Sequence, residues 1–102
     1  MSTHAYNAGK LYENGEPQTL LVYPSQEVKI QASGSGSYRV YGRLTSDGAA
    51  KPLKLINAST YDTADIGEDD NIYICEVAGL HSIFADEVVG VEEIYARAFA
   101  ST

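Results

Sequence analysis

Apolar and polar side chains alternate along much of this chain. Val28, Ile30 and Ala32 are separated by single polar residues, and residues 38–44 alternate in the same way. A period of two is typical of a β-strand with one buried face. Residues 33–37, Ser-Gly-Ser-Gly-Ser, lie between the two runs. Two alternating runs joined by a short Gly/Ser turn predict an antiparallel hairpin.

Further short apolar runs predict further strands. They cover residues 20–23, 53–56, 72–77 and 80–85. The last segment, 88–100, is ambiguous because residues 92–98 contain good helix formers. However, Ile94 and Ala96 alternate with Tyr95 and Arg97, and the segment follows several strand–turn units. The pattern therefore favours a strand there.

Together these runs predict an all-β fold. About seven short strands with turns every 8–12 residues or so indicate a single small antiparallel β-sandwich over residues 19–102. Residues 1–18 show no period, so we expect an extended N-terminal arm or loop that orders against a neighbour. The expected core consists of Leu21, Val28, Ile30, Val40, Leu44, Leu53, Leu55, Ile72, Ile74, Leu80, Ile83, Ile94 and Ala96.

Size and composition limit the function. A chain of 102 residues and 11.0 kDa is one domain, with little room for a separate cofactor domain. One cysteine cannot form an internal disulfide. The first residues lack a basic and apolar leader, and no apolar run approaches the roughly 20 residues of a spanning helix. We therefore expect synthesis in a cytoplasm and no membrane insertion.

Charge divides the chain into two unlike halves. The net charge of −7 argues against binding to nucleic acid or to an anionic membrane. Residues 1–54 hold four acids and six bases (4 against 6, +2), and residues 55–102 hold ten acids and one base (10 against 1, −9). Such a split suits head-to-tail docking on further copies or on a basic partner. A solvated acidic surface that aids solubility is the alternative.

Acidic side chains gather in one polar stretch before the 72–77 strand. Calcium binds six to eight hard oxygen ligands, so a loop of carboxylates is a weak calcium candidate. The EF-hand pattern is not met, and acids also collect naturally in turns. We expect no cofactor and no other metal site. The candidate loop residues are Asp62, Asp65, Glu68, Asp69 and Asp70.

Cys75 and His81 flank the Ala78-Gly79 turn and resemble a thiol nucleophile with its base. Yet Cys75 lies within an apolar strand, and its neighbour Glu76 is acidic, which does not favour a thiolate. A buried small hydrophobic residue is the better interpretation. Since no set of nucleophile, base and orienting group can be assembled, we expect a protein without enzymatic activity.

Tyrosine and arginine side chains recur at outward-type strand positions. The sequence has eight tyrosines, and Tyr offers flat contact area with a polar tip. A protein interface, a carbohydrate-stacking platform of Tyr41, Tyr73 and Tyr95, or ordinary cross-strand pairing would each explain the pattern. The candidate interface residues are Tyr6, Tyr12, Arg39, Tyr41, Arg43, Tyr73, Tyr95 and Arg97.

A longer pattern of strands and turns starts near Val28. It consists of the Gly/Ser turn at 34–37, the 38–44 strand with its Asp47-Gly48 turn, the 52–57 element, the 71–80 segment and a closing strand over 91–99. This layout resembles the small β-sandwich module of tailed-bacteriophage virion proteins. That module occurs in head-decoration (cement) proteins and in head- or tail-fibre domains.

The resemblance implies a structural component of the virion. It implies most directly a capsid decoration protein that is made in the host cytoplasm, binds the outer capsid surface and stabilises the assembled head. Its partners would be the major capsid protein or another virion protein and further copies of itself as a dimer or trimer, with no nucleic acid and no membrane. A tail or fibre adaptor, or a carbohydrate-binding β-sandwich module, is the alternative.

Overall fold

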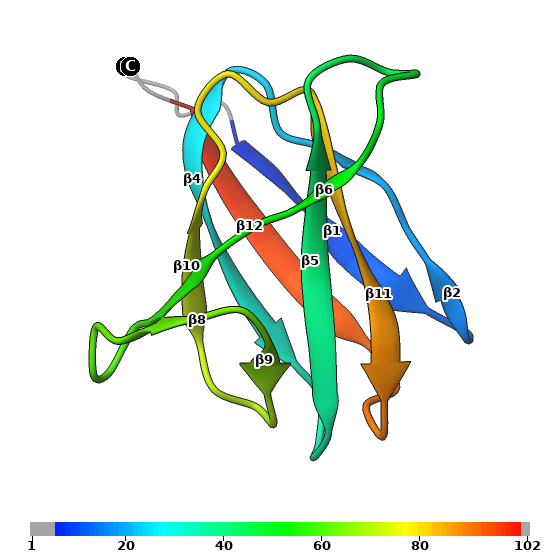
Figure 1. The fold of residues 1–102 in the computed structure, drawn as a ribbon, viewed down its shortest axis with the longest axis vertical. Coiled ribbons are helices and arrows are strands. Elements are labelled where there is room, and N and C mark those ends of the chain that lie inside the picture. Colours follow the sequence, from blue (N-terminus) through cyan, green and yellow to red (C-terminus); the bar gives the residue numbers. More distant parts are fainter. Residues whose placement is uncertain (1–5, 101–102) are drawn as a thin grey trace.

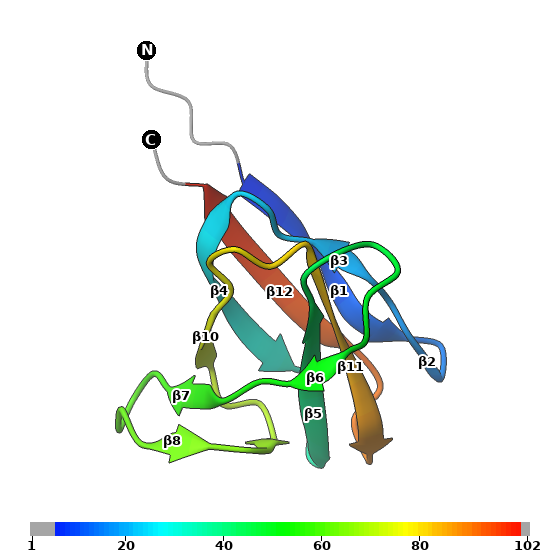
Figure 2. The ribbon, with the colours of Figure 1, turned by 45° about the horizontal axis from the view of Figure 1, so that its top comes forward.

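Two antiparallel sheets pack face to face in the computed structural model, which describes residues 6–100, with side chains from 8 to 97 (Figures 1 and 2). This confirms the predicted all-β sandwich. The seven-stranded sheet has the order β2 (Glu16–Pro17), β1 (Tyr6–Glu13), β12 (Ile94–Ala100), β4 (Ser25–Ala32), β10 (Tyr73–Glu76), β7 (Leu55–Asn57), β8 (Thr63–Ala64). The five-stranded sheet has the order β3 (Leu20–Leu21), β11 (Ser82–Val89), β5 (Ser37–Arg43), β6 (Lys51–Pro52), with β9 (Gly67–Glu68) also paired to β5. Within the described range, no helix is long and apolar enough to cross a bilayer.

The predicted hairpin of residues 28–44 is wrong, because its two strands belong to different sheets. β4 pairs with β12 and β10, whereas β5 pairs with β11, β6 and β9. The Gly/Ser segment at 33–37 therefore crosses between the layers. Both strands still present an alternating buried face, and these faces meet across the core. The alternation was informative about the strands but not about their partners.

The N-terminal segment is also different from the prediction. The sequence predicts an arm or loop over residues 1–18, but Tyr6–Glu13 form β1, which pairs with β12 along its length. Residues 1–5 lie outside the described part. The register shifts between Lys10 and Tyr12, so Leu11 is an extra residue opposite the Tyr95–Ile94 step. Such a β-bulge breaks the period of two and hides the strand from a search for alternation.

The core lies between the sheets and differs in part from the expected one. Its largest fully buried side chains include Leu11, Tyr38 and Ile83. Three expected core residues are exposed instead: Leu21 at 55%, Leu44 at 72% and Ile72 at 45%. Ile74, Leu53 and Leu80 are half-buried. The expected residues that are buried are Val28, Ile30, Val40, Leu55, Ile83, Ile94 and Ala96.

The segment from 88 to 100 resolves into the end of β11, a turn and the strand β12, as the alternation predicts. β12 lies between β1 and β4 and so ties both ends of the chain into one sheet. β12 thus lies within the broad seven-stranded sheet (Figure 1). Its residues Tyr95 and Arg97 are exposed on the outer face of that sheet.

Candidate functional site

The predicted Tyr/Arg surface is divided between the two outer faces of the sandwich. Arg39, Tyr41 and Arg43 lie on β5 in the five-stranded sheet. Tyr95 and Arg97 lie on β12 in the other sheet. The residues therefore do not form one continuous surface.

Tyr73 joins neither face. Its side chain is 3% exposed and packs edge-on against Tyr38 inside the core, with ring centroids 6.4 Å apart. Its hydroxyl oxygen accepts a hydrogen bond from the Glu68 backbone N–H at 3.1 Å. The predicted stacking platform of Tyr41, Tyr73 and Tyr95 is consequently wrong.

On the outer face of the five-stranded sheet, the side chains of Arg43, Phe84 and Tyr41 stack in a row. We call this row the aromatic ladder. Tyr41 and Phe84 are direct cross-strand partners, and their rings stack at 5.4 Å with an interplanar angle of 13°. The Arg43 guanidinium lies 4.6 Å from the Phe84 ring centroid. The Tyr41 hydroxyl donates to the Glu87 carboxylate. All three ladder residues are half-buried, so the contacts stabilise the sheet and leave a partly apolar surface.

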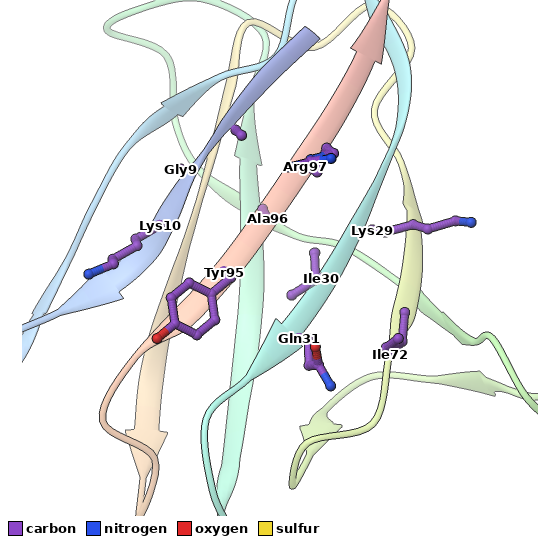
Figure 3. A pocket seen from close by; sticks show the side chains of 10 residues that line it. Gly9, Lys10, Lys29, Ile30, Gln31, Ile72, Tyr95, Ala96 and Arg97 are labelled. Atoms are coloured by element: carbon purple, nitrogen blue, oxygen red, sulfur yellow. The ribbon is translucent and has the colours of Figure 1, made fainter.

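The face of the seven-stranded sheet contains a hollow of about 520 Å³ over β1, β12 and β4, which we call the cationic hollow (Figure 3). Three basic side chains line it, with one exposed aromatic ring and one exposed Ile. The lining residues are Ala8, Gly9, Lys10, Lys29, Ile30, Gln31, Ile72, Tyr95, Ala96 and Arg97. Of these, sequence reasoning named only Tyr95 and Arg97 as candidate site residues.

Two of the cations are opposed. Arg97 on β12 is the direct cross-strand partner of Lys29 on β4. The same row continues to Ala8 on β1 and to Ile74 on β10. The register thus places two basic residues at neighbouring positions on the outer face of this sheet, and the Lys29 side chain extends away from Arg97 over β10 (Figure 3).

The third cation lies at the rim within an ion-pair network. Lys10 Nζ lies 2.7 Å from a Glu13 carboxylate oxygen and 2.9 Å from one of Glu93, which raises its pKa. The Tyr95 hydroxyl donates to Glu93, and Lys10 Nζ lies 5.8 Å from the Tyr95 ring centroid. These contacts lower the pKa of Glu93, through Tyr95 first and then Lys10, and raise the pKa of Tyr95 through Glu93. The network fixes the Tyr95 ring at the edge of the hollow.

The two other aromatic candidates lie on β1. Tyr12 is half-buried and packs against the core near the bulge. The backbone of Tyr6 pairs with Phe99, and its side chain lies outside the described residues.

The acidic loop uses two of its five carboxylates within the chain. Asp65 pairs with Lys54 at 2.7 Å, which lowers the pKa of Asp65. Asp69 accepts from the Gly36 N–H at 3.0 Å, and so holds the crossing segment. Asp62, Glu68 and Asp70 are exposed. Among the residues that the structure describes, no three His, Cys, Asp or Glu side chains converge as a metal site would require.

Cys75 is buried, as the sequence predicts. It is 1% exposed within the core, and burial, followed by the charge of Glu76, raises the pKa of its thiol to about 12. A thiol with this pKa remains protonated at neutral pH, and the thiolate is the nucleophile.

We therefore expect Cys75 to resist alkylation in the folded protein. Iodoacetamide at pH 8 should label the native chain at least about 100-fold more slowly than the chain in strong denaturant, because reaction needs an opening of the core. Intact-mass spectrometry over time measures both rates. Equal rates would contradict the buried position.

Comparison with known proteins shows which solved structures have a similar fold. A scan of protein-family models and a search of curated proteins gave no match. Among solved structures, the SPBc2 prophage-derived protein YomS aligns with a TM-score of 0.79 and 16% identity, covering 98% of this chain and 97% of YomS. The PBSX exported protein XepA aligns with a TM-score of 0.80 and 14% identity, covering 98% of this chain. The chain spans only 39% of XepA. At these identities the likeness shows a shared sandwich fold.

Proposed function

We propose that this chain is a bacteriophage-associated structural protein that acts by docking, and that its particular role is capsid decoration. The observation that carries the proposal is the overlap with YomS, which extends over 98% of this chain and 97% of that prophage-derived protein. The PBSX protein XepA contains the same fold within a longer chain. The strand-and-turn pattern that resembles virion modules supports the narrower role.

Docking is supported by what the two sheet faces display. One face carries the half-buried aromatic ladder, and the other carries the cationic hollow with the exposed ring of Tyr95. Aromatic and arginine side chains are enriched where binding energy concentrates in protein interfaces. The proposal assigns no catalytic step, no cofactor, no nucleic acid and no membrane contact to the chain.

The mechanism would be stabilisation by mass action. A protein that binds the assembled head, and not its separated subunits, stabilises the head by RT ln(1 + [L]/Kd), about 2.7 kcal/mol per site at 100-fold excess over Kd. Many copies on equivalent positions add this term across the shell. The chain would be made in the host cytoplasm and bind the outer capsid surface through the major capsid protein.

The test uses particles of the phage that encodes this chain. We expect purified protein to co-sediment with heads that lack it and to raise the temperature at which those heads release their contents. Separated tails serve as the matched particle. Binding to tails alone would replace decoration with the adaptor role, and binding to neither particle would overturn the proposal of a virion protein.

A further inference from the structure

We propose that the cationic hollow is a glycan-binding site in which the ring of a neutral sugar residue stacks on Tyr95. The ligand would be an oligosaccharide of neutral hexoses or N-acetylhexosamines. This inference goes beyond the capsid role and does not rest on it, because it concerns a small ligand on the outer face of one sheet. The volume of the hollow, about 520 Å³, lies within the range of about 300–1,000 Å³ that is typical of ligand pockets.

Tyr95 presents a ring face to solvent, and its neighbours hold it in that position. Figure 3 views the hollow from outside and shows the ring nearly face-on, so the ring lies along the sheet instead of projecting from it. The side chain is 43% exposed. Its hydroxyl donates to Glu93, and Lys10 binds the same carboxylate at 2.9 Å. A ring that is already fixed in its binding position loses little conformational freedom when a ligand stacks on it.

A sugar matches the groups around this ring because it has two kinds of surface. Its C–H face is apolar and packs on an aromatic ring, and the hydroxyl groups at its edge both donate and accept hydrogen bonds. Gln31 on β4 is the direct cross-strand partner of Tyr95, and its Nε2 donates to the Asp70 carbonyl at 2.9 Å, which orients the amide. The amide retains a carbonyl oxygen and a second N–H for sugar hydroxyls. Ile72, 45% exposed, adds apolar lining on the β10 side.

Other classes of ligand fit the hollow less well. Lys10 is bound by Glu13 and Glu93, so its charge does not select an anion. Arg97 also has an interaction within the chain, and Lys29 extends away over β10 (Figure 3). The two rim carboxylates and the net charge of −7 disfavour a nucleic acid. Both β12 and β4 pair with a strand on each side, so an extended peptide cannot add to the sheet here.

Saturation-transfer NMR on the purified chain tests the site directly. The probes are the methyl glycosides of glucose, galactose, mannose and N-acetylglucosamine, together with a linear trisaccharide of each sugar. Sialyllactose is the acidic comparison. We expect at least one neutral trisaccharide to bind, with the strongest saturation on the C–H protons of one face of a sugar ring, because stacking on Tyr95 brings that face closest to the protein.

Four variants separate stacking from hydrogen bonding and from general effects. Tyr95→Ala should weaken binding at least about 10-fold, as removal of a ring that stacks on a nucleobase does. Tyr95→Phe keeps the ring face and should bind within about 5-fold of the natural chain. Gln31→Ala should weaken binding by about 2–10-fold, and it tests the site even if Tyr95→Ala does not fold. Tyr61→Ala is the matched control, because that tyrosine is 74% exposed and lies outside the hollow, and it should bind as the natural chain does.

Failure of every neutral probe to bind would overturn the inference, and so would binding of sialyllactose alone. Binding that Tyr95→Ala leaves unchanged, or that Tyr95→Phe lowers as much as Tyr95→Ala does, would also overturn it. These outcomes are independent of the capsid experiment. A chain that binds heads but no sugar keeps the proposed function and loses only this site, and a chain that binds sugar but no particle does the reverse.

Discussion

Leu11→Ala is expected to lower the free energy of unfolding by about 2–5 kcal/mol. Leu11 is 0% exposed and belongs to the core cluster, although it lies in a segment whose sequence predicts an arm. Truncation removes buried methyl groups and leaves a cavity beneath the β1 bulge, where paired strands restrict collapse. A loss of this size would be much of the stability of a 102-residue domain.

Leu44→Ala is the matched control, because the same side chain is removed at a residue that the alternation places in the core. Leu44 is 72% exposed, so its truncation should change stability by no more than about 0.5 kcal/mol. Urea unfolding followed by circular dichroism measures both variants, with an unchanged m-value as evidence that the comparison is valid. If Leu44→Ala proves the more damaging change, the described position of β1 is wrong.

The contrast between these two leucines shows what local pattern can and cannot specify. Strand positions could be predicted where alternation is regular, as in residues 28–32 and 38–44, since a half-buried strand needs that pattern. Leu44 falls just beyond β5, where the alternation continues in the sequence after the strand has ended. Leu11 lies at a bulge, where the strand continues although the alternation stops.

Strand phase in a continuous apolar run was not predictable. Residues 72–77 are apolar at nearly every position, so either set of alternate side chains could face inward. Pairing decides between them: Tyr73 lies opposite Ile30 and Cys75 opposite Val28, and both partners face the core. The pairing of β10 with β4 thus determines which side chains of β10 face the core. That is why Tyr73 is buried and Ile72 lines the cationic hollow.

The composition of the candidate surfaces likewise depends on which strands pair with one another. Outward positions of Tyr41 and Tyr95 could be read from alternation, but their sheets could not, because loops such as 33–37 cross between layers instead of turning within one. Lys29 was visible as a polar position on β4. Its opposition to Arg97 follows only from the register of two strands more than 60 residues apart in the chain, which local spacing does not specify.

Gly36→Ala is expected to lower the free energy of unfolding by about 3 kcal/mol or more. A Cβ at this position would lie 2.0 Å from the Val89 carbonyl oxygen and 2.9 Å from the Val91 nitrogen, and φ is +154°. Both contacts are to backbone, which cannot rotate away as a side chain does. Gly36 also donates to the Asp69 side chain and accepts from the Asp69 N–H at 2.8 Å. Moving the crossing segment would therefore break its link to the acidic loop.

Gly34→Ala measures the cost of placing a side chain on a backbone with positive φ, without the steric clash that an added Cβ would meet at Gly36. Gly34 has a φ of +86° in the same segment, but a Cβ at this position would have no neighbour within 4 Å, so only the left-handed conformation resists a side chain. That cost is about 1–2 kcal/mol. Thermal unfolding should show Gly36→Ala melting well below Gly34→Ala, since each kcal/mol shifts Tm by roughly 4–8 °C in a domain of this size. Equal melting temperatures would mean that the 33–37 crossing does not pass as close to the end of β11 as described.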